Sequence, residues 1–364
     1  MGKIQVTTRA KDVRPYEIFI GSGLLEQTGS LVESLKRDKP DPASVVIVTD
    51  DIVNSLYSEK VSASLERAGF TVRVFAFPNG ERGKTHETLL NLYAFLAEAR
   101  VTRADLIIAL GGGVVGDLAG YAAATFLRGI DYIQIPTTLL AQTDSSVGGK
   151  TGVNIEAGKN LAGAFYQPLL VICDTGTLST LLPGTFSDGM AEIIKHGMIY
   201  DAELFGTADA GSVRPNNISD IIERSVRVKA GVVERDVHEK GERMKLNFGH
   251  TLGHAIEKYR GFSGITHGSA VAVGMSVITE ISERLGLTEK GTHGKLKACL
   301  EKYNLPSSLD ELGGVRPEMG ELYKCCVNDK KHSGGAINVV LCDKIGSCFI
   351  KKMTADEFQE FLWT

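Results

Sequence analysis

The sequence lacks several features that would define a protein's partners. It has no apolar run approaching the roughly 20 residues that cross a bilayer, and residues 1–9 lack the apolar core of a secretory signal. Its six cysteines include no Cys-x-x-Cys pair, so we expect reduced thiols in a cytoplasmic protein. The formal net charge of −4 leaves no excess of basic residues for general nucleic-acid binding. These absences predict a protein without membrane or nucleic-acid partners.

The length and the hydrophobic patterning predict two domains. A chain of 364 residues is too long for one ordinary core. In the first half, short apolar strands alternate with amphipathic helices, which is typical of a parallel sheet with helical crossovers. We expect strands at 45–49, 71–77 and 105–110, and helices at 53–69 and 85–100. The fold class is therefore α/β, and we place this domain at 1–176.

Beyond Pro183 helical patterns dominate. We expect helices at 188–200, 217–233, 244–259, 269–285 and 295–303, and one late hairpin formed by 336–341 and 347–350. The second domain, 177–364, is thus predicted to be mainly α-helical.

The histidines are concentrated in one short stretch. Asn-Phe-Gly-His-Thr-Leu-Gly-His-Ala-Ile-Glu at 247–257 sets His250 and His254 four residues apart, on one face of a helix, and His267 follows. Three of the eight histidines therefore lie within eighteen positions, 250 to 267. The pattern favours a divalent metal site over a helix with two polar-face histidines and an unrelated loop histidine. An anionic ligand would have to come from elsewhere.

Glu192 is one source of that anion. It precedes Lys195 by three residues and His196 by four, so a surface ion pair is the default interpretation. The alternative makes Glu192 the carboxylate ligand of a site with two histidines and open positions for substrate.

A glycine turn at 111–117, Gly-Gly-Gly-Val-Val-Gly-Asp, follows the expected strand 105–110. It satisfies Gly-x-Gly-x-x-Gly between a strand and a helix, a context in which the backbone approaches a pyrophosphate. The alternative is a tight turn without a ligand. Asp50, at the end of the strand 45–49, is the best candidate for the cofactor ribose, because such ligands bind at the carboxyl ends of parallel strands.

A second glycine-rich loop spans 144–151. It ends like a P-loop, but Asp144 stands where that motif requires glycine, so the motif of a nucleoside triphosphatase is excluded. The loop presents Asp144 and Lys150, with Lys159 nearby. Several cations lie close to the candidate sites in the sequence: Lys195, Lys229, Arg243, Lys330 and Lys331. Each one alone is expected to be a solvated charge. Together they predict a substrate with more than one negative group.

Taken together, these motifs resemble the 3-dehydroquinate synthase family over most of the chain. The stretches that carry the resemblance are 111–117, 136–152, 189–195, 246–257 and 329–331. It implies a Rossmann-like NAD-binding domain, a helical domain and an active site between them. It also implies a divalent metal, zinc with cobalt as the alternative, held by Glu192, His250 and His267. His254 is then a substrate-side group and not a ligand, contrary to its spacing from His250.

The resemblance also implies roles for individual residues. Substrate contacts or catalytic groups would be Lys150, Asn160, Lys195, Lys229, Arg243, Asn247, His254 and Lys330 (or Lys331), with Lys159 matching either substrate or cofactor. Arg128 matches an arginine supplied by a neighbouring subunit to the phosphate, so a homodimer is expected. The cofactor side would comprise Asp50, Glu81, Lys84, Gly112, Gly113, Val114, Asp117, Thr137, Thr138, Asp144, Ser145, Lys159, Thr177, Thr180 and Leu181.

The activity that the resemblance implies is a redox-neutral elimination and cyclisation. The substrate would be 3-deoxy-arabino-heptulosonate 7-phosphate, which is oxidised by NAD, loses phosphate, is reduced again and closes by an intramolecular aldol step. The alternative is a metal-dependent, NAD-linked polyol or glycerol-phosphate dehydrogenase of similar architecture, which would accumulate NADH.

Overall fold

The computed structural model describes residues 1–7, 14–35, 42–330 and 336–364, and for 328–330 the backbone alone. The chain divides into two compact units. The first comprises Met1–Leu181 and Val233–Val237, and the second Leu182–Val232 and His238–Thr364. None of the helices in the described ranges combines the length and the apolar character needed to traverse a bilayer.

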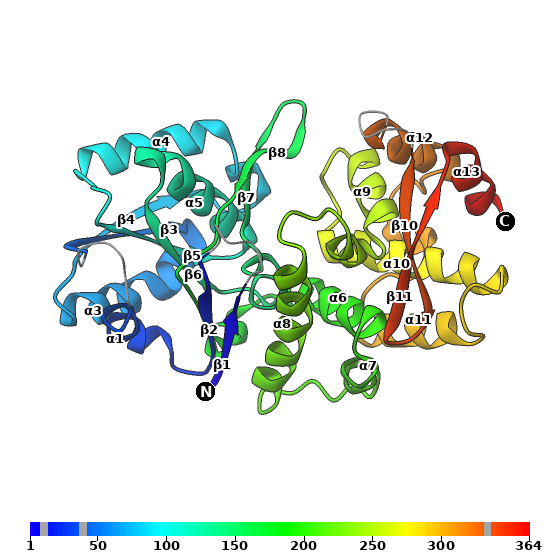
Figure 1. The fold of residues 1–364 in the computed structure, drawn as a ribbon, viewed down its shortest axis with the longest axis horizontal. Coiled ribbons are helices and arrows are strands. Elements are labelled where there is room, and N and C mark those ends of the chain that lie inside the picture. The colour runs from blue at the N-terminus through cyan, green and yellow to red at the C-terminus, as the bar shows by residue number, and fades with distance from the viewer. Residues whose placement is uncertain (8–13, 36–41, 331–335) are drawn as a thin grey trace. The chain divides into compact units, whose positions relative to one another are not determined.

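A seven-stranded sheet forms the centre of the first unit (Figure 1). Across the sheet the order is β1 (Gly2–Val6), β2 (Tyr16–Gly21), β9 (Leu170–Asp174), β6 (Asp131–Pro136), β5 (Leu106–Gly111), β3 (Ser44–Asp50) and β4 (Thr71–Phe77). Only β1 pairs antiparallel with its neighbour; the other described pairs are parallel. The predicted α/β class and the three predicted strands are confirmed, whereas β1, β2, β6 and β9 were not predicted.

Helices cover both faces of this sheet. They are α1 (Thr28–Glu33), α3 (Glu59–Arg67), α4 (His86–Glu98) and α5 (Gly113–Thr125). Because successive side chains of a strand point to opposite faces, β3 feeds two cores. Val46 and Val48 pack with residues of α4 and α5, and Val45 and Ile47 pack with residues of α1 and α3.

The strand order creates a topological switch point at β3. From β3 the chain passes to β4 on one side and then to β5 on the other. In parallel sheets, ligands bind at the carboxyl ends of strands where the order reverses in this way. Asp50 ends β3 and Gly111 ends β5, so both lie at that edge.

Outside the main sheet, β7 (Lys150–Ile155) and β8 (Gly158–Phe165) form an antiparallel hairpin. It carries the loop residues Lys150, Lys159 and Asn160. Strand β7 also lies against α5 and α4. The hairpin was not predicted from the sequence.

The second unit is mainly helical (Figure 1). Its elements include α6 (Pro183–Ile199), α7 (Ala202–Asp209), α8 (Ile218–Arg235, except for its last residues 233–235), α9 (His250–Tyr259), α10 (His267–Arg284), α11 (Thr292–Lys302), α12 (Met319–Lys330), β10 (Ile337–Lys344), β11 (Ser347–Met353) and α13 (Ala355–Trp363). The predicted late hairpin is confirmed as β10 and β11, which pair antiparallel. Helices α6 and α9 both pack against α10.

The single helix predicted at 244–259 is wrong. A 3-10 turn (Glu242–Asn247) precedes α9, and Gly249 separates them with a left-handed backbone at φ 77°. A Cβ at Gly249 would lie 2.5 Å from Met275 Cγ, and a Cβ at Gly274 would lie 2.0 Å from the Gly249 carbonyl oxygen. Glycine at both positions therefore permits the close approach of α9 to α10.

Candidate active site

Glu192 lies on α6 and is 1% exposed. The Lys195 ammonium, three residues further on the same helix, contacts its Oε2. Among the described residues, neither Glu192 oxygen accepts a well-aligned hydrogen bond, so Lys195 balances the charge without satisfying the acceptors. A buried carboxylate in this state is costly unless another cation completes it.

Two histidine nitrogens face the same Glu192 oxygen. His250 Nε2 lies 3.7 Å and His267 Nε2 3.8 Å from Glu192 Oε1, and one ligand atom from each of the three residues lies within 4.8 Å of the others. Ligands of a tetrahedral zinc ion, at bond lengths near 2.1 Å, stand about 3.4 Å apart. The two nitrogen-to-carboxylate distances are therefore a few tenths of an ångström longer than in a closed zinc site. A divalent metal fits this donor set.

The orientation of the His250 ring is fixed by the main chain. Its Nδ1 lies 3.1 Å from the Phe248 carbonyl oxygen. A carbonyl oxygen only accepts, so Nδ1 carries the proton and Nε2 presents its lone pair towards Glu192. His250 is the first residue of α9, directly after the Gly249 turn.

His254 lies one turn further along α9 and is exposed. Its ring centroid is 5.3 Å from that of His250 and 6.1 Å from that of His267. His254, Glu257 and His267 also bring one ligand atom each within 4.8 Å. Two possible ligand groups thus share His267, and only the first contains a buried, unsatisfied carboxylate.

The pKa values of the two inner histidines move in opposite directions. Burial, followed by the charge of Lys195, lowers the pKa of His250 well below its usual value. Burial also acts to lower the pKa of His267, but the Glu257 and Glu192 carboxylates outweigh it and raise that pKa. The neutral state of His250 is the form that binds a metal.

Buried cations accompany this group in the second unit. Lys195 is 1%, Lys229 6% and Arg243 2% exposed. Lys229 lies on α8, one turn after Ser225. Buried ammonium and guanidinium groups form strong charge-assisted hydrogen bonds with anions, so these residues are suited to an anionic ligand.

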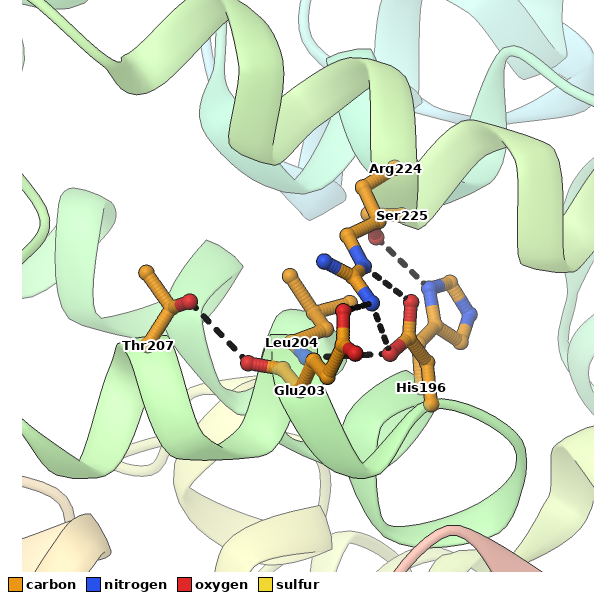
Figure 2. A network of polar contacts seen from close by, with 7 residues as sticks. His196, Glu203, Leu204, Thr207, Arg224 and Ser225 are labelled. Atoms are coloured by element: carbon orange, nitrogen blue, oxygen red, sulfur yellow. Dashed lines mark hydrogen bonds and ion pairs between the residues drawn. The ribbon is translucent and has the colours of Figure 1, made fainter.

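A polar network connects α8 to α6 and to α7 (Figure 2). His196 Nδ1, next to Lys195 on α6, lies 2.7 Å from Ser225 Oγ on α8. Arg224 Nη2 donates to Asp201 Oδ1 at 2.7 Å and to Glu203 Oε2 at 2.6 Å. The network fixes the segment of α8 that carries Lys229.

Asn247 and Glu239 form a further polar pair. The Asn247 amide donates to Glu239 Oε1 at 2.7 Å, and Glu239 has a left-handed backbone at φ 56°. Such strain in a residue other than glycine is often kept at functional sites. No signal in the sequence pointed to Glu239, because the strain depends on the tertiary fold.

In the first unit, the glycine turn begins α5 as predicted. Gly112 is its N-cap residue and Gly113 the first helical residue, followed by Val114. A Cβ at Gly113 would lie 3.0 Å from Ser145 Oγ, and a Cβ at Gly116 2.7 Å from Gln134 Oε1. The turn is thus tight against its neighbours, with N–H groups directed out of the helix start. Asp50, 3% exposed, already uses Oδ1 to accept from Val53 N at 3.0 Å.

Glu81, Lys84 and Asp117 form a charge cluster in which Lys84 is buried and the two carboxylates are half-buried. Lys84 Nζ lies 3.0 Å from Asp117 Oδ2 and 3.2 Å from Glu81 Oε1. Burial opposes the lysine's charge, but the two carboxylates raise the pKa of Lys84. Burial likewise acts to raise the pKa of Glu81, but Lys84, Asn154 and Lys159 lower it overall.

Asn154, on β7, is a residue that the sequence analysis missed. Its Nδ2 donates to Glu81 Oε1 at 2.7 Å, its N donates to the Lys84 carbonyl at 2.9 Å, and its Oδ1 accepts from Asn160 N at 3.0 Å. It therefore pins the hairpin that carries Asn160 to the charge cluster. Only the unpredicted hairpin brings these residues together.

The remaining cofactor candidates lie in segments after β6 and β9. These are Thr137 and Thr138 directly after β6, Asp144 and Ser145 in the helical turn Ala141–Ser145, and Thr177, Thr180 and Leu181 at the turn Thr175–Thr180. Thr137 N donates to the Gly111 carbonyl at 3.0 Å, and Tyr57 Oη lies 2.6 Å from Thr180 Oγ1. Parallel strands place these segments at the carboxyl edge of the sheet.

Other candidates are exposed or lie outside the described side chains. Lys150, Asn160 and Arg128 are exposed, and the last two have left-handed backbones, at φ 55° and 65°. Lys330 ends α12, but its side chain is outside the described residues, as is Lys331 altogether.

Comparison with known protein families covers both units. Residues 74–188 match the model described as 3-dehydroquinate synthase N-terminal, and 189–332 match 3-dehydroquinate synthase C-terminal. The 3-dehydroquinate synthase of Clostridium acetobutylicum is 46% identical over 350 residues, which cover 95% of this chain and 96% of that protein.

Solved structures with the same fold carry cofactors. A 2-deoxy-scyllo-inosose synthase complexed with carbaglucose-6-phosphate, NAD+ and Co2+ is 26% identical, with a TM-score of 0.84 and 99% of each chain covered. The 2-epi-5-epi-valiolone synthase of Streptomyces hygroscopicus, with NAD+ and Zn2+ bound, is 25% identical, with a TM-score of 0.85 and 98% of each chain covered. A glycerol dehydrogenase from Schizosaccharomyces pombe, 17% identical at a TM-score of 0.64 over 95% of this chain and 87% of its own, shares the fold alone.

Proposed function

Because this chain belongs to the 3-dehydroquinate synthase family, we propose that it converts 3-deoxy-arabino-heptulosonate 7-phosphate to 3-dehydroquinate and phosphate. In that case it is a carbon–oxygen lyase of the shikimate pathway, which leads to the aromatic amino acids. We place it in the cytoplasm and expect it to act as a homodimer.

The observation that carries this proposal is that buried cations accompany the candidate metal ligands Glu192, His250 and His267. In the same unit, Lys195, Lys229 and Arg243 are buried to at least 94%. A polyol dehydrogenase requires the metal ligands and the nucleotide turn, but it has no need for three buried cations. A substrate with a carboxylate and a phosphate does, since charge-assisted bonds to such groups are strong only where water is excluded.

Two bound groups would supply the redox and Lewis-acid chemistry. Held by Glu192, His250 and His267, a divalent metal supplies a Lewis acid for a substrate oxygen; we propose zinc, with cobalt as the alternative. Bound at the Gly112–Gly113 turn, with Asp50 and the Lys84 cluster near its edge, NAD supplies a hydride acceptor that can return the hydride within one turnover.

The chain's own residues bind and orient the substrate. We assign the carboxylate and phosphate to the buried lysines and Arg243, together with Lys150, Asn160, Asn247, Lys330 and an Arg128 from a second copy. His254, exposed beside the metal group, is suited to hold or pass a proton at a substrate oxygen. Oxidation of the substrate alcohol acidifies the neighbouring C–H bond, so that elimination of phosphate becomes possible, and the protein's task is mainly positioning.

The ratio of phosphate to NAD tests this function. Because the hydride returns to the substrate, we expect many equivalents of phosphate per NAD supplied, without a steady rise in NADH absorbance. The measurement combines a phosphate assay with absorbance at substoichiometric NAD. Stoichiometric NADH without phosphate release would instead identify a dehydrogenase.

A further inference from the structure

We propose that Glu257 is a positioning residue that holds the His267 imidazole with Nε2 directed towards Glu192 and His250. This inference rests on the metal site of the proposed function and extends it by one residue. Glu257 is on α9 and is 6% exposed, whereas His267 is the first residue of α10.

The contact between the two side chains selects one ring nitrogen. Glu257 Oε2 lies 3.5 Å from His267 Nδ1, while His267 Nε2 lies 3.8 Å from Glu192 Oε1. An ionised carboxylate only accepts hydrogen bonds, so the proton of the neutral ring belongs on Nδ1. The lone pair of Nε2 is then free for the metal. Metal-bound histidines commonly donate their other ring nitrogen to such a carboxylate.

The alternative is that Glu257 is itself a ligand, in the group with His254 and His267. One imidazole nitrogen cannot donate a proton to Glu257 and bind a metal at the same time. The two Nε2 atoms of His250 and His267 converge on one oxygen of Glu192, which is buried and accepts no well-aligned hydrogen bond among the described residues. His254, by contrast, is exposed. The geometry therefore favours a metal at Glu192 and a supporting role for Glu257.

Asp188 fixes the main chain on which His267 is mounted. Asp188 lies one turn before Glu192 on α6, and its Oδ1 accepts from Gly268 N at 2.5 Å. A Cβ at Gly268 would lie 2.5 Å from the Asp188 carbonyl oxygen and 2.7 Å from its Cα. The backbone beside His267 is thus held by the helix that carries Glu192. The ring can still rotate about its side-chain bonds, and Glu257, from α9, restrains that rotation.

Metal affinity, measured without substrate or NAD, tests the proposal. The variants are Glu257→Ala and the near-isosteric Glu257→Gln, with Glu280→Gln as the control, because Glu280 is an exposed glutamate on α10. Competition with a chromophoric chelator gives the zinc and cobalt affinities, and the absorption bands of bound cobalt report its ligands. We expect Glu257→Ala to bind about 10–100-fold more weakly than the parent, with unchanged cobalt bands at saturation. Glu257→Gln should lose less, since its amide oxygen still accepts, and Glu280→Gln should match the parent.

Two outcomes would overturn the proposal. If Glu257→Ala binds metal like the parent, Glu257 does not position the ring. Should that variant fail to fold, unchanged affinity in Glu257→Leu, which has no acceptor for His267 Nδ1, leads to the same conclusion. If Glu257→Ala binds metal as weakly as Glu192→Ala, and its cobalt bands at saturation differ from those of the parent, Glu257 is a ligand. Neither result depends on turnover, so a parent protein that binds metal but releases no phosphate would refute the proposed function and leave this test intact.

Discussion

Lys195 and Arg243 are among the largest fully buried side chains of this protein. A buried charge loses its hydration, and the loss is recovered only with close partners. Glu192 is buried beside Lys195 with both carboxylate oxygens poorly satisfied. These buried charges are suited to bind a cation at Glu192 and an anion at Lys195 and Arg243.

Single substitutions should separate the metal ligands from the substrate-side histidine. We expect His267→Ala to weaken metal binding strongly, because it removes one of three protein ligands. His254→Ala should retain the metal and lose turnover. Metal content after dialysis and phosphate release are the two measurements.

The control for this pair is His293→Ala, which changes a histidine on α11, outside both ligand groups. Equal metal loss from the His254 and His267 variants would mean that the helical pair, and not the Glu192 group, holds the metal.

At the scale of elements, helix α6 carries much of the site. Asp188, which accepts a hydrogen bond from Gly268 N, lies one turn before Glu192 on this helix. Lys195 and His196 follow in the next turn. Its neighbours α7 and α8 are connected by Arg224, which contacts Glu203 (Figure 2) and also Asp201. Asp201 also caps α7 by accepting from Leu204 N at 3.0 Å.

This tie predicts a dependence of stability on pH. Burial acts to raise the pKa of Asp201, but the bonds from Arg224 and the Leu204 amide lower it overall. A carboxyl with a depressed pKa stabilises the fold above its ordinary value, about 3.9, and loses that contribution as the pH falls through the lowered pKa. Asp201→Asn keeps the capping oxygen but loses the charge. We expect it to lower Tm by about 1 °C at pH 7, as for a loss of about 1 kcal/mol in a chain of 364 residues, and by less as the pH falls below 4.

Glu203→Gln is the matched control, because Glu203 contacts the same Arg224 but its side chain is 83% exposed. Thermal unfolding followed by circular dichroism from pH 3 to 7 is the measurement. An Asp201→Asn deficit that stays constant with pH would show that the charge contributes nothing.

At the scale of the whole molecule, the proposed reaction requires residues of both units. The nucleotide turn and the Lys84 cluster belong to the first, and the metal group and buried cations belong to the second. Arg128 and Lys150 are both exposed in the single chain. We proposed that Arg128 contacts the substrate phosphate in the active site of the other copy of the chain.

Mixing two inactive variants tests that assignment. Arg128→Ala and Lys150→Ala should each impair turnover, and a mixed dimer should contain one intact site if Arg128 acts across the interface. We expect activity to recover partially after subunit exchange, as measured by phosphate release. Mixing each variant with itself is the control. No recovery, despite exchange shown by differently tagged copies, would mean that each chain uses its own Arg128.

The sequence by itself determined the α/β class, the helical second half and the glycine turn. These features depend on local patterns: the strands 45–49, 71–77 and 105–110 are short apolar runs, and the turn at 111–117 has a glycine order that few other structures need. The late hairpin was also predictable, because its two apolar stretches stand close in the sequence. Patterning missed β7 and β8, whose glycines and polar residues obscure any alternation.

Only the tertiary structure decided how the metal group and the charge cluster are composed. Spacing alone favoured His250 with His254, since four residues span one helical turn; the family resemblance implied Glu192 and His267 in its place. Glu192 precedes His250 by fifty-eight positions, and the fold brings its carboxylate within 3.8 Å of the Nε2 atoms of His250 and His267. It does so because glycines at 249 and 274 let α9 and α10 approach closely and α6 packs against α10. Asn154, Glu239 and Glu257 gain their roles in the same way. Their partners lie on other segments, and no local pattern records contacts that form only when the chain folds.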